Sequence, residues 1–168
     1  MQIVISDSSC LLELHKAELL IKMVNLPFTF VVPQPLFDDE LDSIGAAEKQ
    51  QLIALGLQII TLPGEQVKAA QDYSNQNKRA SIYACFALVI AESAENAILL
   101  TGDDALRVLA EDKSIETCGL FWTLDMLEQY ALVDRLRLIS ILEQFQSNPF
   151  MMLPENEIKA RIRKLRVS

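Results

Sequence analysis

The first ten residues contain the feature that most constrains the fold, a short buried strand that leads directly into an acidic turn. Ile3, Val4 and Ile5 form a β-branched apolar run that is typical of a buried strand. Asp7 follows at once, and the apolar-periodic segment after Ser9 predicts a helix. Asp7 therefore lies at the carboxyl end of a strand, where ligands bind in open α/β sheets. A helix N-cap would also explain this aspartate.

The same arrangement recurs later in the chain. Residues 97–100 predict a strand, and Thr101, Gly102 and Asp103 form the turn into a helical pattern. Two strand-end aspartates in one sheet are harder to explain as two independent caps. The order of strands and helices predicts an α/β fold with a parallel sheet.

A third acid is expected at the same edge of the sheet. Residues 28–32 predict a strand that ends at Pro33, and Pro35 fits the first turn of the next helix. That helix, over residues 36–44, carries four acids, which would usually form a solvated face. Glu40 lies next to the apolar side of the helical wheel, so it is the acid of this group that we expect at a site.

Charge and residue types narrow the chemistry. The net charge of −8 disfavours a general nucleic-acid binder, and a carboxylate cluster around a divalent cation would explain part of the acidic excess. His15 is the only histidine and is interpreted as a solvated helical residue, which removes histidine-centred catalysis. Cys10, Cys85 and Cys118 have no zinc or disulfide spacing and are expected in the core.

The carboxylates of Asp7, Glu40 and Asp103 are hard oxygen ligands on different elements. Without a histidine or cysteine partner, such a set suits Mg²⁺ or Mn²⁺. The expected chemistry is metal-assisted hydrolysis of a nucleic-acid backbone. Other sites with an acid at a strand end fit less well. The chain lacks the lysine of a receiver domain, has Ser9 where a dehalogenase-like site needs a second aspartate, and lacks the glycines of nucleotide-binding loops.

The C-terminal stretch differs from the rest of the chain. The apolar run at residues 149–154 is expected either to form an exposed patch or to dock onto another surface. Residues 155–166 predict an amphipathic basic helix. This helix would bind a partner or an RNA backbone, self-associate, or pack onto the body of the chain. We divide the chain into a domain of residues 1–147 and a basic helical tail of residues 148–168.

With these features, the chain resembles the PIN-domain ribonucleases, in particular the VapC-like toxins of type II toxin–antitoxin pairs. The matching pieces are ISDSSCLLEL, PLFDDEL, ASIYACFALVIAE and LLTGDDALRVLAE, in the family's order over residues 1–125. The resemblance implies a three-layer α/β/α fold with a central parallel sheet of four to five strands. It also implies a quartet of acids that binds Mg²⁺ or Mn²⁺, RNA as the substrate, an antitoxin protein as a partner, and a homodimer or higher oligomer.

The resemblance assigns roles to individual residues by position. Asp7 matches the first acid of the quartet, Glu40 the second and Asp103 the last. Ser9 matches the small polar residue that helps to hold the first acid, and Thr101 matches the hydroxyl residue before the last.

The third acid of the quartet is missing. The family's helix usually carries aspartate where this chain has Ala84, and alanine has no ligand oxygen. Losing such a carboxylate should lower the rate by several orders of magnitude. Two explanations stay open. One is a deliberate inactivating substitution in a toxic nuclease, and the other is a natural PIN fold that has lost activity and serves as a binding module.

The sequence therefore predicts a metal-dependent endoribonuclease, the toxin of a toxin–antitoxin pair, that is inactive or weakened at Ala84. Lys78, Arg79, Arg107 and the basic tail are expected to supply the positive surface for RNA. The alternatives are a non-catalytic PIN-like module that binds a protein partner, and an α/β domain whose acids only cap helices. Neither a bilayer-spanning apolar run nor a signal peptide is found, so we expect a cytoplasmic protein without membrane contact.

Overall fold

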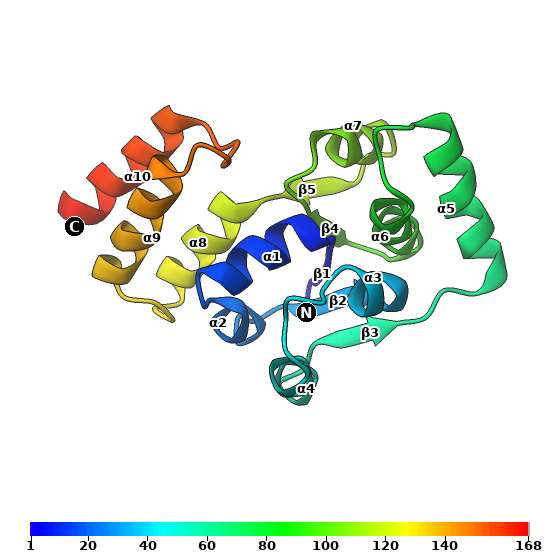
Figure 1. Ribbon diagram of the computed structural model, residues 1–168, viewed down its shortest axis with the longest axis horizontal. Helices are drawn as coiled ribbons and strands as arrows, with labels where there is room; N and C mark the ends of the chain where they lie inside the picture. Colours follow the sequence, from blue (N-terminus) through cyan, green and yellow to red (C-terminus); the bar gives the residue numbers. More distant parts are fainter. Residues whose placement is uncertain (168) are drawn as a thin grey trace. The chain divides into compact units, whose positions relative to one another are not determined.

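The computed structural model describes residues 1–167 and contains a five-stranded sheet in which all neighbouring strands are parallel (Figure 1). The strand order is β3-β2-β1-β4-β5, so the first strand of the chain lies in the middle of the sheet. The strands are β1 (Ile3–Ser6), β2 (Thr29–Pro33), β3 (Gln58–Ile60), β4 (Ala97–Leu100) and β5 (Glu116–Cys118). The predicted parallel sheet of four to five strands is confirmed.

Helices flank this sheet and complete the predicted three-layer α/β/α fold. In the first half of the chain they are α1 (Ser8–Lys16), α2 (Leu20–Val24), α3 (Gln34–Asp39), α4 (Ala46–Ala54) and α5 (Gly64–Gln76). In the second half they are α6 (Ile82–Ser93), α7 (Asp104–Asp112), α8 (Leu120–Gln129), α9 (Arg135–Ser147) and α10 (Glu155–Val167). No helix within residues 1–167 is both long and apolar enough to cross a lipid bilayer.

One face of the sheet is covered by α6 and α7. Ile5, Val31 and Leu99 come from three adjacent strands and pack in one apolar cluster with residues of both helices. The run from Ala84 to Ala91 in α6 is buried throughout, which agrees with a helix that is apolar nearly all round. Burial of each large apolar side chain contributes about 1.5–3 kcal/mol, so this layer anchors the centre of the fold.

The opposite side of the sheet carries α1 and α2 (Figure 1). The helical pattern predicted after Ser9 forms two helices in the structure, the first ending at Lys16 and the second beginning at Leu20. Glu18 has a left-handed backbone conformation with φ of 59°, which ends the first helix and redirects the chain into α2.

The helix that carries Glu40 is shorter than predicted. The expected helix over residues 36–44 ends at Asp39, and Glu40 is its C-cap. Consecutive acids at this end disfavour further helix, because the helix dipole places partial negative charge there. Instead, Nζ of Lys49 donates a 2.9 Å hydrogen bond to the carbonyl oxygen of Phe37, which satisfies one acceptor of the last turn.

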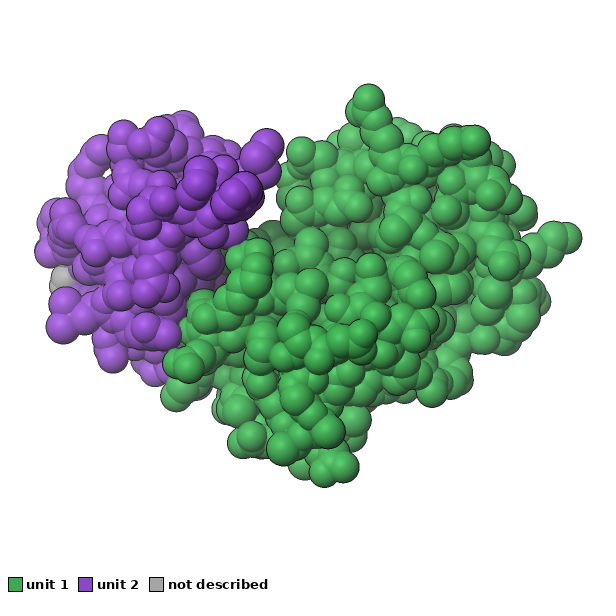
Figure 2. All heavy atoms as spheres, in the orientation of Figure 1, with its two compact units in different colours: residues 1–123 green, residues 124–168 purple. Residues whose placement is uncertain are grey.

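The chain divides into two compact units, residues 1–123 and residues 124–168 (Figure 2). Within the second unit, α10 packs against α9 and buries Ile158, Ile162 and Leu165, the apolar side of the predicted amphipathic helix. Packing onto a neighbouring helix, one of the four expectations for this helix, is therefore observed. The predicted division after residue 147 stays a prediction.

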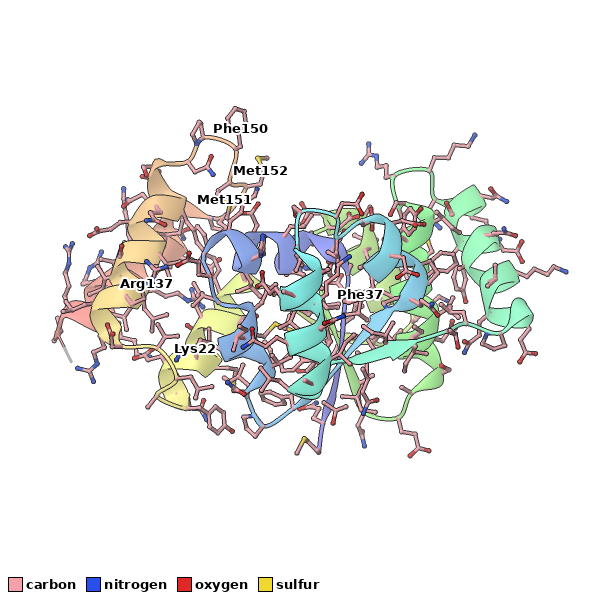
Figure 3. All side chains as sticks on the ribbon, turned by 60° about the horizontal axis from the view of Figure 1, so that its bottom comes forward. Lys22, Phe37, Arg137, Phe150, Met151 and Met152 are labelled. Carbon is pink, nitrogen blue, oxygen red and sulfur yellow. The ribbon has the colours of Figure 1, made fainter. Side chains whose placement is uncertain are left out.

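The loop between α9 and α10 exposes apolar side chains. Phe150 and Met152 are 88% and 93% exposed, as the sequence predicted for this run (Figure 3). The helix after it is basic, but ion pairs within the unit engage several of its cations. Lys159 pairs with Glu155 at 3.0 Å, and Arg166 pairs with Glu143 at 2.8 Å. These pairs leave less positive charge for RNA than the sequence alone suggests.

Candidate active site

The site lies where the sheet changes its winding direction. The strands β1 and β4 are adjacent and parallel, yet β2 and β3 extend from one side of β1 and β5 from the far side of β4. Such a switch point is where open α/β sheets bind ligands, beyond the carboxyl ends of the strands. Asp7 follows β1 and Asp103 follows the turn after β4, so both predicted acids lie at this edge. The backbone N–H of Asp7 donates to the carbonyl oxygen of Leu100 at 3.1 Å.

Both oxygens of the Asp7 carboxylate accept hydrogen bonds. Oδ1 accepts from the backbone N–H of Ser9 at 3.1 Å and from its hydroxyl at 2.7 Å. Oδ2 accepts from the hydroxyl of Thr101, which is fully buried. Asp7 itself is 3% exposed. The two supporting residues predicted from the family resemblance, Ser9 and Thr101, therefore both contact the first acid.

The turn after β4 is tied to the turn after β1. The backbone N–H of Gly102 donates to the Ser9 hydroxyl at 2.8 Å, and the N–H of Asp103 donates to the Thr101 hydroxyl at 2.9 Å. A Cβ at Gly102 would lie 3.3 Å from the Ser9 oxygen, so a glycine permits this close approach. The same hydroxyls that hold Asp7 thus also position the turn that carries Asp103.

Asp7 and Asp103 each cap a helix and also lie at the candidate site. Asp7 is the N-cap of α1, and Oδ1 of Asp103 accepts from the backbone N–H groups of Ala105 and Leu106 at 2.9 and 3.3 Å. Capping explains one oxygen of each carboxylate. It does not explain why Asp7 is buried beside a second acid, so the expectation of caps alone leaves that arrangement without a cause.

The electrostatic environment of Asp7 opposes its ionised form. Burial raises the pKa of the Asp7 carboxyl above its ordinary value of 3.8, while the hydrogen bonds from Thr101 and Ser9 lower it. The negative charge of Asp103 raises this pKa further, because it disfavours a second negative charge at Asp7. A cation between them would relieve both the burial of the charge and the repulsion.

Glu40 reaches the site indirectly. Its Oε1 accepts a 3.1 Å hydrogen bond from the hydroxyl of Ser8, the residue after Asp7. Burial raises the pKa of the Glu40 carboxyl, the Ser8 hydrogen bond lowers it, and the charge of Asp39 raises it. Ser8 was missed in the sequence because its contact depends on where α3 ends. The only sequence signal was a second hydroxyl beside Asp7.

We expect Ser8→Ala to raise the pKa of Glu40 further above its ordinary value. The substitution removes the donor that favours the ionised carboxylate and leaves burial and Asp39 in place. A carbon-13 NMR titration of the Glu40 carboxyl would measure the change. Ser43→Ala, at an exposed serine of the following loop, is the matched control. An unchanged pKa in Ser8→Ala would contradict the contact.

Ala84 lies in the first turn of α6, after Ser81 has capped the helix. The Ser81 hydroxyl accepts from the backbone N–H of Ala84 at 3.1 Å. Ala84 is 4% exposed and belongs to the apolar cluster under the sheet. The next residue, Cys85, has a pKa raised to about 11, first by burial and then by the charge of Asp103. The first turn of α6 therefore lies near the last acid.

The remaining titratable residues singled out in the sequence lie away from this site or in the core. His15 is not solvated as predicted but half-buried, with Nδ1 3.2 Å from a carboxylate oxygen of Glu48. Cys10 and Cys85 are buried, which confirms the core interpretation for both. Cys118 is half-buried at the end of β5, and burial is the main cause that raises its pKa to about 12.

The carboxylate oxygens of the site are suitable ligands for a divalent cation, but few of them lie close together. Carboxylate oxygens are the ligands that Mg²⁺ and Mn²⁺ prefer, and Mg²⁺ is often bound by one or two carboxylates with several waters. Asp7 and Asp103 supply two carboxylates, and Glu40 accepts a hydrogen bond from Ser8, the residue after Asp7. Within residues 1–167, no group of three or more His, Cys, Asp or Glu side chains is close enough to hold a metal ion.

Comparison with known proteins bears directly on this geometry. A family model described as a PIN domain matches residues 3–166 and so spans both compact units. A search of curated proteins finds no significant match. The match covers nearly the whole chain and agrees with the parallel sheet. The chain therefore belongs to the PIN-domain family.

Proposed function

We propose that this protein is a metal-dependent endoribonuclease that hydrolyses RNA phosphodiesters, and that it is the toxin of a toxin–antitoxin pair. PIN domains are generally nucleases, which supports a hydrolase at the coarse level. The observation that carries the proposal is the carboxylate pair at the switch point. There, the carboxylate of buried Asp7 accepts hydrogen bonds on both oxygens, and the charge of Asp103 raises its pKa. The proposal includes cytoplasmic location, an antitoxin partner and a homodimer or higher oligomer.

Some residues of the site would bind the metal ion, and others orient its ligands. Asp7 and Asp103 would hold Mg²⁺ or Mn²⁺, with Glu40 as the adjoining acid. When bound, the ion supplies polarisation of the phosphodiester and activation of the attacking water. Ser9 and Thr101 fix the orientation of the Asp7 carboxylate, so little reorganisation is needed when the substrate arrives.

Ala84 limits the expected activity. The position supplies no oxygen to the site, so the ion would depend on fewer carboxylates and be held and oriented less well. We therefore infer that this chain is inactive or weakened as a nuclease. A non-catalytic module that binds a protein partner is the second candidate. The packing of Ala84 in the apolar cluster favours this second candidate, because an alanine there contributes to the core and supplies no ligand oxygen.

Mn²⁺ titration and an RNA cleavage assay test the proposal together. We expect weak Mn²⁺ binding by isothermal titration calorimetry and slow RNA cleavage that EDTA abolishes. Asp103→Asn should lose both Mn²⁺ binding and RNA cleavage, because asparagine keeps the helix cap but removes the charge. Asp112→Asn, at the exposed far end of α7, is the matched control and should behave like the unmodified chain. Failure of the unmodified chain to bind Mn²⁺ would favour the interaction module.

A further inference from the structure

We propose that Arg107 binds a phosphate of the RNA backbone beside the acidic site. This inference deepens the proposed ribonuclease function and rests on it. It identifies one residue through which a strongly acidic unit would hold a polyanionic substrate, and it selects that residue from the several cations that the sequence offered.

Arg107 is built into the turn that carries Asp103. Its backbone N–H donates to the carbonyl oxygen of Asp103 at 3.0 Å, so it lies one helical turn further along α7. Its Nη2 donates to the carbonyl oxygen of Thr101 at 3.2 Å. The hydroxyl of that threonine holds Asp7. A Cβ at Gly119 would lie 3.7 Å from Nη2, which places the guanidinium between the ends of β4 and β5.

Arg107 is a positive charge in a unit that contains many more acidic than basic residues. Residues 1–123 contain 17 Asp and Glu against 8 Lys and Arg. Several of these cations are committed elsewhere. Lys16 pairs with Glu13, Lys113 pairs with Glu92, and Lys49 caps α3. Among the contacts of the described residues, Arg107 is the cation of this unit that bonds to the acid-bearing turns.

The guanidinium has unused capacity for a phosphate. The side chain of Arg107 is 39% exposed, and only Nη2 is engaged by the backbone. Nη1 lies 3.5 Å from a carboxylate oxygen of Asp104, whose side chain is 95% exposed. Such a surface ion pair is worth about 0–1 kcal/mol, so a phosphate can replace the carboxylate. The planar fork of arginine matches two phosphate oxygens at once.

RNA binding without cleavage tests this assignment. Fluorescence anisotropy with a labelled single-stranded oligoribonucleotide of mixed sequence would be measured in EDTA, at salt concentrations from about 50 to 200 mM. We expect Arg107→Gln to weaken binding roughly tenfold and to reduce the slope of log K against log salt by about 0.7, the value for one phosphate contact on a single strand. Arg107→Lys should keep the slope and lose part of the affinity.

Two further variants separate this contact from a general charge effect. Lys68→Gln removes one exposed positive charge from α5 and should change affinity much less than Arg107→Gln. Asp104→Asn releases the guanidinium and should tighten binding, and it should do so more than Asp112→Asn at the far end of α7. Thermal melting of each variant confirms that the fold is retained.

The outcomes distinguish this proposal from the proposed function. Equal effects of Arg107→Gln and Lys68→Gln, or equal effects of the two aspartate variants, would overturn the assignment of Arg107 while leaving the ribonuclease proposal intact. An unmodified chain that binds no RNA at all would overturn both. Binding that depends on Arg107 in a chain that cleaves nothing would support the contact and count against catalysis.

Discussion

Replacing Ala84 with aspartate is expected to give Mn²⁺-dependent RNA cleavage several orders of magnitude faster than that of the unmodified chain. The position lies in the first turn of α6, and the thiol of the adjacent Cys85 responds to the charge of Asp103. A carboxylate there would join Asp7 and Asp103 and complete the quartet that the family resemblance implies. The same variant should arrest growth of its expression host if the protein is a toxin.

The measurement compares initial cleavage rates with and without Mn²⁺, together with thermal melting. Ala84→Asn is the matched control, because it has the shape of aspartate without its charge. In EDTA we expect Ala84→Asp to melt at a lower temperature, since Ala84 is 4% exposed and the new charge is buried. Mn²⁺ should restore the melting temperature through binding to the folded state. A well-folded Ala84→Asp that cleaves no RNA would favour the interaction module.

Asp7→Asn is expected to stabilise the metal-free protein at neutral pH while it abolishes Mn²⁺ binding. The folded-state pKa of Asp7 is raised by burial and by Asp103, so the ionised carboxylate is disfavoured in the fold. Asparagine can keep a hydrogen bond to Thr101 with its direction reversed, because its Nδ2 can donate to the Thr101 hydroxyl oxygen, which has two lone pairs. The gain should be on the order of 1 kcal/mol or more in the free energy of unfolding.

The stability gained by Asp7→Asn should depend on pH. A raised folded-state pKa means that the native protein binds the Asp7 proton more tightly than the unfolded chain does. The contribution of Asp7 to stability is therefore fully present below its ordinary pKa of 3.8 and is lost as pH rises through the folded-state value. Asp7→Asn should thus gain stability at pH 7 and gain none below that range. Urea unfolding in EDTA, at pH 7 and at a pH below the ordinary pKa of 3.8, measures the difference in stability. The control is Asp104→Asn, at an exposed aspartate.

Much of the fold followed from the sequence because its signals are local. Short β-branched runs marked the strands, and an aspartate after a strand marked the sheet edge where ligands bind. Asp7 and Asp103 were predicted on this basis, and the structure places both at the switch point. The hydroxyls of Ser9 and Thr101 were identified through the family resemblance, and both hold Asp7.

The features that were missed depend on contacts between distant elements. The expected position of Glu40 relied on a helical wheel over residues 36–44, but that helix ends before Glu40. Its contact with Ser8 arises because the chain leaves α3 in a particular direction, which no periodicity records. His15 was interpreted as solvated from its polar neighbours in sequence, whereas Glu48, on another helix, lies beside it.

The central position of β1 has a consequence for synthesis of the chain. β1 is made well before its neighbour β4, and the Asp7–Thr101 contact joins residues 94 positions apart. Contacts of such high sequence separation form late, because the loop between them must close first. A nascent chain that has not yet reached residue 97 therefore has one unpaired edge on β1 and no paired carboxylates. The acidic pair forms only when the N-terminal strand meets a segment made much later.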